Sequence, residues 1–178
     1  QTNGTFTDLR DGKKYKTVKI GEQVWMAENL SYLPSVIGPS ISSDTTAYYY
    51  VYGYADTVVA DAKATVNYTT YGVLYNWTAA MNGSASNSSI VQGVCPTGWH
   101  LPSDTEWKEL TVYLGEASVA GGKLKETDTT HWISPNAGAT NETGFAALPG
   151  GSRFYEKFAH IGYNGPGGVL WSRKSMLH

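Results

Sequence analysis

The chain has 178 residues, with 13 Lys and Arg against 15 Asp and Glu, a formal net charge of -2 and a pI near 6.1. Charged residues make up only 16% of the sequence, and they form no basic stripe, which argues against a nucleic-acid partner. No run of about 18 apolar residues occurs, so no membrane-spanning helix is predicted. The length suits a single domain over residues 1–178 that can bury a hydrophobic core.

The N-terminal segment predicts a three-stranded β-meander over residues 5–28. Asp11 and Gly12 give a strong hairpin turn signal, and the segment KKYKTVKI after them alternates as a strand with two different faces does. Gly21 then turns the chain into the segment QVWMAENL. This succession of strands and tight turns is typical of antiparallel pairing between neighbouring strands.

A tyrosine-rich strand and a short helix are predicted next. In the segment AYYYVYGYAD, alternate tyrosines share one face of a strand, which is either an exposed platform for sugars or the half-buried face of a sheet. The segment YGVLYNWTAAMNG predicts a helix over about residues 74–81 that ends at Asn82 and Gly83. Trp77 and Met81 share one face of that helix, so we expect Trp77 to belong to the core.

The segment CPTGWHLPSDTEWKEL leads into a second predicted helix over about residues 104–114. Ser103 followed three residues later by Glu106 is the signature of a capping box, and the apolar residues of the helix recur at i, i+3 and i+7. Cys95 and His100 are the obvious nucleophile and base, but no third residue is placed to orient them. We therefore interpret the segment as a structural corner with a buried or disulfide-directed Cys95, and not as a catalytic centre.

The last third of the chain is rich in Gly, Asn and Ser, and predicts a long loop over residues 123–145 followed by short strands. A loop of this length in a compact domain is usually functional or disordered. We expect no cofactor and no metal site, because the four His show no spacing typical of zinc. A calcium ion bound by side-chain oxygens of the loop is the alternative left open, although no EF-hand pattern is present. The oxygen donors are Glu126, Asp128, Asn136, Asn141 and Glu142.

Two kinds of ligand chemistry remain open. Glycoside hydrolysis needs two carboxylates in one cleft, and Glu106, Glu126 and Glu142 are the candidates if the chain is an enzyme. Sugar binding without catalysis needs flat aromatic rings and polar groups for the hydroxyls. Because polar and glycine residues flank them, we expect Trp132 and Tyr163 to be exposed. The candidates for sugar binding are Trp132, Tyr155, Tyr163 and Asn164.

Several segments together resemble the Fibrobacter succinogenes major paralogous domain family, in family order and over nearly all of the chain. The LPSDTEW corner and the later ALPGGSRF segment also resemble the wider group of formylglycine-generating-enzyme-like and C-type-lectin-like folds. The resemblance implies an α+β domain of small twisted antiparallel sheets with two short helices and long loops. The segments are FTDLRDGKKYKTVKIGEQVWMAENL, YYYVYGY, YGVLYNWTAAM, CPTGWHLPSDTEWKEL, TNETGFAALPGGSR and LWS.

The same resemblance implies a secreted or surface protein of fibre-degrading or gut bacteria, and the fold relatives suggest binding or adhesion, although fold does not fix function. The sulfatase-activating relatives use cysteine chemistry near their C-terminus, where this chain has no Cys, so that activity is not carried over. We therefore expect a non-catalytic carbohydrate-binding or adhesion module whose partner is a polysaccharide or another glycan. The alternatives are a glycoside hydrolase and a structural subunit of a surface assembly.

Family members usually continue past the Trp-Ser motif with further strand and end near a second Cys, whereas this chain ends in LWSRKSMLH. We therefore expect a truncated C-terminus, which would leave Cys95 unpaired and the edge of a sheet incomplete. Because an open sheet edge pairs readily with another strand, self-association through the C-terminal strand is a further hypothesis.

Overall fold

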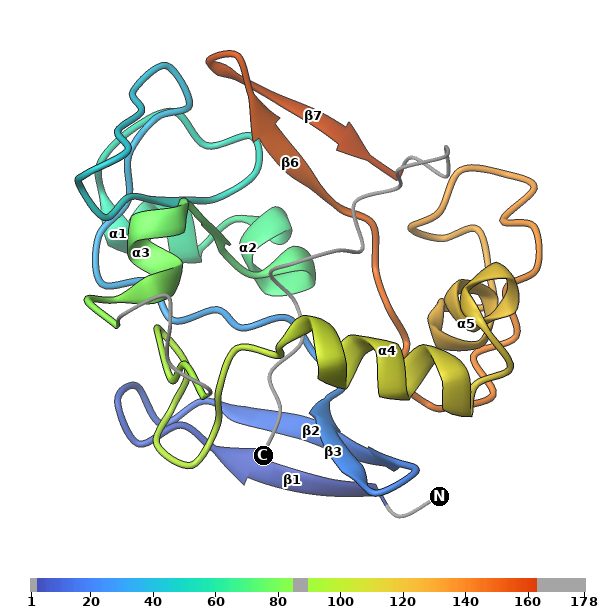
Figure 1. Cartoon of the computed structure of the whole chain (residues 1–178). Coiled ribbons are helices and arrows are strands. Elements are labelled where there is room, and N and C mark those ends of the chain that lie inside the picture. Colours follow the sequence, from blue (N-terminus) through green and yellow to red (C-terminus); the bar gives the residue numbers. More distant parts are fainter. Residues whose placement is uncertain (1–2, 85–89, 163–178) are drawn as a thin grey trace.

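The structure is a computed structural model that describes residues 3–84 and 90–162 (Figure 1). Its elements are small antiparallel sheets and short helices joined by long loops, as expected for an α+β domain. In chain order they are β1 Asn3–Thr7, β2 Lys14–Ile20, β3 Gln23–Met26, β4 Tyr49–Tyr50, α1 Val59–Lys63, α2 Val66–Tyr71, β5 Leu74–Tyr75, α3 Trp77–Met81, α4 Asp104–Tyr113, α5 Ala117–Leu124, β6 Gly150–Phe154 and β7 Lys157–Ile161.

The strands β1, β2 and β3 form one antiparallel sheet in that order, which confirms the predicted meander. The pairing places Tyr15 opposite Phe6 on one face and Val18 opposite Trp25 on the other. Tyr15 belongs to a hydrophobic cluster that includes buried residues of α2 and α3, whereas Val18 and Trp25 belong to a cluster with α4 and α5. The N-terminal sheet therefore contributes to both parts of the core through its two faces.

The N-terminal end of α4 carries the predicted capping box. Ser103 Oγ accepts a hydrogen bond from the Glu106 main-chain N–H at 3.3 Å, and a Glu106 carboxylate oxygen accepts one from the Ser103 N–H at 2.7 Å. Buried Leu110 packs in the same cluster as Trp25, and the Trp107 and Trp25 ring centroids are 4.9 Å apart. α4 thus runs alongside the N-terminal sheet (Figure 1), and the segment before it is a structural corner.

The predicted helix over residues 74–81 is wrong in its first turn. Leu74–Tyr75 is the strand β5, which pairs with β4 at Tyr49–Tyr50, and α3 begins only after Asn76. The Asn76 side-chain oxygen accepts a hydrogen bond from the Ala79 N–H at 2.9 Å and so caps the helix at this point. The predicted tyrosine strand is likewise shortened to the two residues that pair with β5.

Three helices, α1, α2 and α5, are additional to the two that the sequence predicts, so the expectation of two helices is wrong. α5 contains two adjacent glycines, which weaken the helix signal. It forms nevertheless because Ala120 and Leu124 are buried in the cluster that also contains the inner face of α4. A Cβ atom at Gly122 would lie 2.0 Å from the main-chain oxygen of Gly138, so glycine allows the following loop to approach this helix.

The loop between α5 and β6 is anchored at Ala147. The Ala147 main-chain oxygen accepts hydrogen bonds from the Glu126 N–H at 3.2 Å and from the Trp132 indole N–H at 3.0 Å. Trp132 is only 3% exposed, and the Lys125 ammonium lies 4.6 Å from the centroid of its ring. The expectation that Trp132 is exposed is therefore wrong. It was based on the polar residues that flank Trp132 in the sequence, whereas its burial results from contacts with residues farther along the loop.

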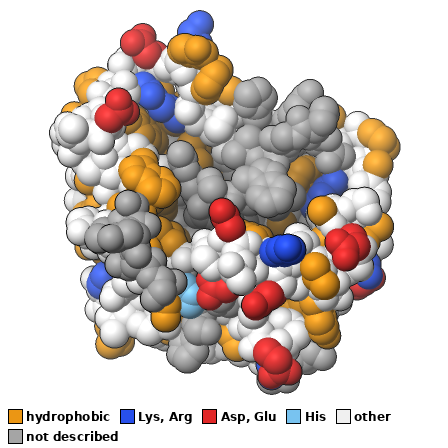
Figure 2. Space-filling view, in the orientation of Figure 1, with side chains coloured by type: hydrophobic (Ala, Val, Ile, Leu, Met, Phe, Trp, Pro, Cys, Tyr) orange, Lys and Arg blue, Asp and Glu red, His pale blue; other side chains and the backbone are white. Residues whose placement is uncertain are grey.

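Among the described residues, no helix combines the length and the apolar character that crossing a bilayer requires. On the face shown in Figure 2, the basic side chains of the described residues are dispersed and do not merge into one patch. The predicted strand with the LWS motif, and the edge through which self-association is expected, fall in residues 163–178, outside the part of the chain that the structure describes.

Candidate functional site

A pocket of about 460 Å³ lies where the loop before β4, the start of α3 and the end of β6 meet. Trp77, the first residue of α3, borders this pocket and is 66% exposed. A large aromatic side chain with this exposure beside a pocket leaves an apolar surface open to solvent at the border of the pocket. The lining includes Ser42, Ser43, Asp44, Tyr50 and Arg153.

The position of Trp77 follows from the side chain that precedes it. Asn76 Oδ1 accepts hydrogen bonds from the N–H groups of Ala79 and Tyr48, each at 2.9 Å, and Asn76 Nδ2 donates to the Ser43 main-chain oxygen at 2.9 Å. One amide therefore fixes the beginning of α3 and the loop that forms the opposite wall of the pocket. This network fixes the main chain from which the Trp77 side chain extends, while the ring itself is largely in solvent.

Arg153 gives the same pocket a positive charge. Its Nε donates to the Pro39 main-chain oxygen at 2.8 Å, and its guanidinium lies 5.6 Å from the centroid of the Tyr50 ring. Its Nη2 is buried and has no hydrogen-bond partner. Asp44, which is exposed, adds a carboxylate to the lining. The pocket thus combines a flat apolar ring with hydrogen-bond donors and acceptors.

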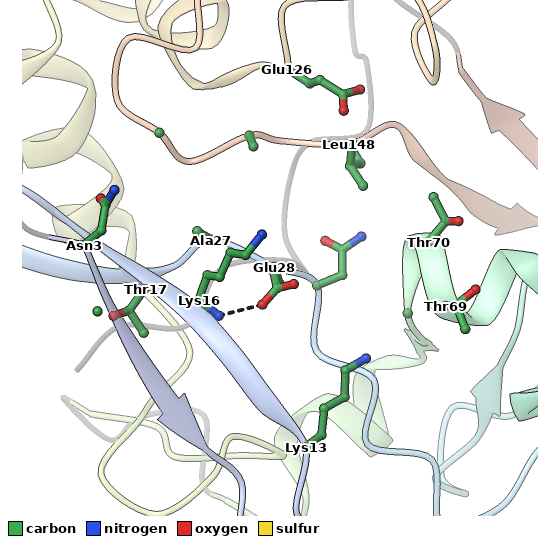
Figure 3. Close-up of a pocket in the computed structure, with 15 residues that line it drawn as sticks. Asn3, Lys13, Lys16, Thr17, Ala27, Glu28, Thr69, Thr70, Glu126 and Leu148 are labelled. Atoms are coloured by element: carbon green, nitrogen blue, oxygen red, sulfur yellow. Dashed lines mark hydrogen bonds between the residues drawn. The ribbon is translucent and has the colours of Figure 1, made fainter.

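A second pocket, of about 330 Å³, lies between β2, α2 and the loop before β6 (Figure 3). Charged side chains line it, namely Lys13 and Lys16 from the N-terminal sheet region and Glu28 and Glu126 from other segments. Burial lowers the pKa of Lys13, and the nearby carboxylates of Glu28 and Asp11 oppose this change. No aromatic side chain among the described residues lines this pocket, so it lacks the surface on which a sugar ring stacks.

Each candidate catalytic carboxylate has an internal basic partner. Glu106 lies at the start of α4, whereas Glu126 and Glu142 lie in the loop after α5. Each of these contacts pairs one candidate carboxylate with a base, and neither of the two pockets above is lined by more than one of the three candidates. The pairs are Glu106 with His100 at 2.9 Å, Glu126 with His131 at 2.8 Å and Glu142 with Lys123 at 2.9 Å.

Cys95 lies in the core and not in a pocket. The residue is buried, and burial raises the pKa of its thiol to about 12, although the charge of Arg10 acts in the opposite direction. A nucleophilic Cys needs a lowered pKa and an exposed sulfur atom. The prediction that Cys95 is buried is therefore confirmed.

The predicted sugar-binding residues differ in their exposure to solvent. Tyr155 is 81% exposed at the turn between β6 and β7, so its ring is accessible, whereas Trp132 is buried. Tyr163 and Asn164 lie outside the described residues. The sequence interpretation also missed Trp77, which was placed in the core by its spacing from Met81. The signal that identifies it is Asn76, because an Asn cap makes Trp77 the first residue of the helix, one turn before the buried face.

These features define a mixed α/β domain of small antiparallel sheets and short helices, with a polar pocket beside an exposed tryptophan. The model of the Fibrobacter succinogenes major domain family matches residues 18–176, and the chain belongs to this family. No curated protein and no solved structure matches the chain. The family assignment agrees with the resemblance that the sequence motifs indicate.

Proposed function

We propose that this chain is a non-catalytic carbohydrate-binding or adhesion module, and that the pocket beside Trp77 is its binding site. The observation that carries the proposal is the exposed indole at the border of a polar pocket. A sugar ring has apolar C–H faces and a rim of hydroxyls, so it suits a site with one flat aromatic surface and several polar groups around it.

The polar lining supplies the second half of this recognition. Asp44 offers acceptor oxygens, Ser42 and Ser43 offer hydroxyls, and Arg153 offers N–H donors. Buried or partly buried polar groups discriminate between ligands that pair with them and ligands that do not. The site therefore suits a polysaccharide or another glycan better than an apolar small molecule.

The proposal includes the fold group and the location that the family suggests. The capped α4 helix against a small antiparallel sheet supports a C-type-lectin-like arrangement, in which binding is a common role. Membership of the Fibrobacter succinogenes major domain family supports a secreted or surface protein of a bacterium. Fold and family membership alone do not fix the ligand, so the argument for binding rests on the pocket.

The test is affinity gel electrophoresis and calorimetry of the full chain with soluble plant polysaccharides, including xylan, xyloglucan, mannan, mixed-linkage glucan and pectate. We expect at least one of them to bind, and we expect Trp77→Ala to weaken that binding at least tenfold. Tyr113→Ala is the matched control, since Tyr113 is an aromatic residue 67% exposed on α4 and outside the pocket. Equal binding by the Trp77 variant and the native chain would refute the site.

The same samples separate the alternatives. Release of reducing sugar that is lost on replacing Glu106, Glu126 or Glu142 would indicate a glycoside hydrolase. Polymerisation that depends on protein concentration, without glycan binding, would indicate a structural subunit. Binding without product release is the result that the proposal requires.

A further inference from the structure

A turn after α5 brings three metal-ligating side chains together. Glu126, Asp128 and His131 each offer one ligand atom, and these atoms all lie within 4.8 Å of one another. Ligand atoms around a tetrahedral or octahedral cation at about 2.0–2.2 Å are separated by roughly 3–3.5 Å. Small rotations of the side chains therefore bring the three atoms to coordination distance without refolding of the turn.

The chain on both sides of the turn is fixed. On one side, Lys125 pairs with Ala147 in an isolated parallel β-bridge, and the Glu126 N–H donates to the Ala147 main-chain oxygen. On the other side, buried Trp132 directly follows His131, and its indole N–H donates to the same oxygen. Ligands carried on a segment that is anchored at each end lose little conformational entropy when an ion binds. The main chain of the turn is thus held in position before an ion binds.

Asn136 holds the main chain of the turn in place. It is 5% exposed, and its Nδ2 donates to the main-chain oxygens of Glu126 at 2.8 Å and Asp128 at 2.7 Å. Its Oδ1 is buried and has no hydrogen-bond partner. A buried amide oxygen without a partner is costly, and this oxygen belongs to the side chain that holds the two carboxylate-bearing residues in place.

All three side chains make hydrogen-bond contacts at the turn. His131 Nδ1 is 2.8 Å from a Glu126 carboxylate oxygen, and an Asp128 carboxylate oxygen accepts a hydrogen bond from the Thr130 N–H at 2.8 Å. Two carboxylates beside one imidazole leave excess negative charge at the turn. Of the three, Glu126 also lines the pocket of Figure 3.

We propose that Glu126, Asp128 and His131 form a site for a divalent transition-metal ion, with Zn²⁺ as the best match. An imidazole nitrogen together with carboxylate oxygens suits Zn²⁺, whereas Ca²⁺ takes oxygen ligands only. Three protein ligands leave a coordination position for water or for a ligand in the adjoining pocket. This differs from the sequence analysis, which found no zinc spacing among the four His and left open a calcium site made of loop oxygens.

Isothermal titration calorimetry of the full chain with ZnCl₂ and CaCl₂ tests the site. We expect one equivalent of Zn²⁺ to bind with a dissociation constant in the micromolar range, and Ca²⁺ to bind at least tenfold more weakly. His131→Gln and Asp128→Asn are each expected to weaken Zn²⁺ binding at least tenfold. Co²⁺ is the spectroscopic probe, and its visible absorption in the site is expected to disappear in the His131 variant.

The matched control is His100→Gln, which alters the other His–Glu pair of the described chain and is expected to change Zn²⁺ affinity less than twofold. Circular dichroism and urea unfolding show whether each variant is folded before it is titrated. The proposal is overturned if no saturable Zn²⁺ binding occurs, if the His131 and Asp128 variants bind as the native chain does, or if Ca²⁺ binds as tightly as Zn²⁺. These outcomes do not depend on whether the Trp77 pocket binds a glycan.

Discussion

Two His–Glu pairs of nearly equal length have different surroundings in this protein. His100 lies 2.9 Å from Glu106 at the start of α4, and His131 lies 2.8 Å from Glu126 in the turn after α5. The second Glu106 oxygen accepts hydrogen bonds from the Ser103 N–H at 2.7 Å and hydroxyl at 2.8 Å. Among the described residues, no main-chain N–H donates to the Glu126 carboxylate in this way. A second carboxylate, that of Asp128, lies beside it instead.

The difference shows that a His–Glu pair alone does not identify a binding site. The carboxylate must also have oxygen atoms that are not already used by other hydrogen-bond donors of the protein. Burial raises the pKa of Glu106, but the hydrogen bonds from Ser103 and His100 outweigh it and hold that pKa below its ordinary value. This carboxylate is fully used in holding the corner. The turn at Glu126 and the pocket at Trp77 retain side chains that can still bind a partner.

The largest effect expected in the corner concerns Cys95. A thiol pKa of about 12, against the ordinary value of 9.0, lowers the thiolate fraction at pH 8 about a thousandfold. We expect the native chain to react with iodoacetamide at least a hundredfold more slowly than the chain unfolded in urea, as followed by mass spectrometry. Equal rates in the folded and unfolded states would show that the Cys95 thiol is accessible in the folded chain. The corner would then not be a closed structural element, in contrast to the accessible pocket at Trp77.

The next effect concerns the core beneath the corner. Leu110→Ala removes a fully buried side chain of α4 and is expected to lower the free energy of unfolding by about 3 kcal/mol. Val112→Ala on the same helix is the control, because Val112 is exposed, and it is expected to cost less than about 0.5 kcal/mol. Urea unfolding measures both; similar losses in the two variants would contradict the packing of α4.

A smaller effect distinguishes the two pairs directly. Glu106→Ala removes the capping box and the contact with His100 and is expected to cost about 2 kcal/mol. Glu126→Ala removes one side-chain pair and is expected to cost less than about 1 kcal/mol. The comparison fails if the Glu126 variant loses as much stability as the Glu106 variant.

The contribution of Glu106 also depends on pH. Its pKa in the folded chain lies below the ordinary value of 4.5, so its charged form stabilises the fold above about pH 4.5, and this stabilisation is lost as the pH falls through the folded-state pKa. The difference in unfolding free energy between the native chain and Glu106→Gln is therefore expected to be largest near neutral pH. A difference that grows below pH 4 would have the wrong sign.

The smallest expected change in stability belongs to the proposed binding pocket. Trp77→Ala removes a side chain that is 66% exposed, and it is expected to change the free energy of unfolding by less than about 0.5 kcal/mol. Urea unfolding measures the stability of this variant. A stable variant that no longer binds glycan would show that Trp77 acts in binding and not in folding. A loss of several kcal/mol would instead indicate that Trp77 belongs to the core, as its helical spacing predicts.

Local signals in the sequence predicted the meander and the corner. The turn at Asp11 and Gly12 and the alternation after it specify neighbouring antiparallel strands, and Ser103 with Glu106 specifies the first turn of α4. These features succeed because each depends on residues only a few positions apart. The buried state of Cys95 follows from the same corner.

The candidate sites depend on contacts between distant parts of the chain, and for that reason the sequence did not specify them. The buried Trp132 donates a hydrogen bond to the main-chain oxygen of Ala147, 15 residues later. Trp77 and Arg153 of β6 line one pocket.

By itself, the sequence determined the family, the order of the N-terminal strands and the capped helix, because short-range hydrogen bonding and hydrophobic spacing encode them. Only the tertiary structure decided which tryptophan is exposed and which carboxylates meet His131, since exposure and ligand geometry arise when loops fold back over one another.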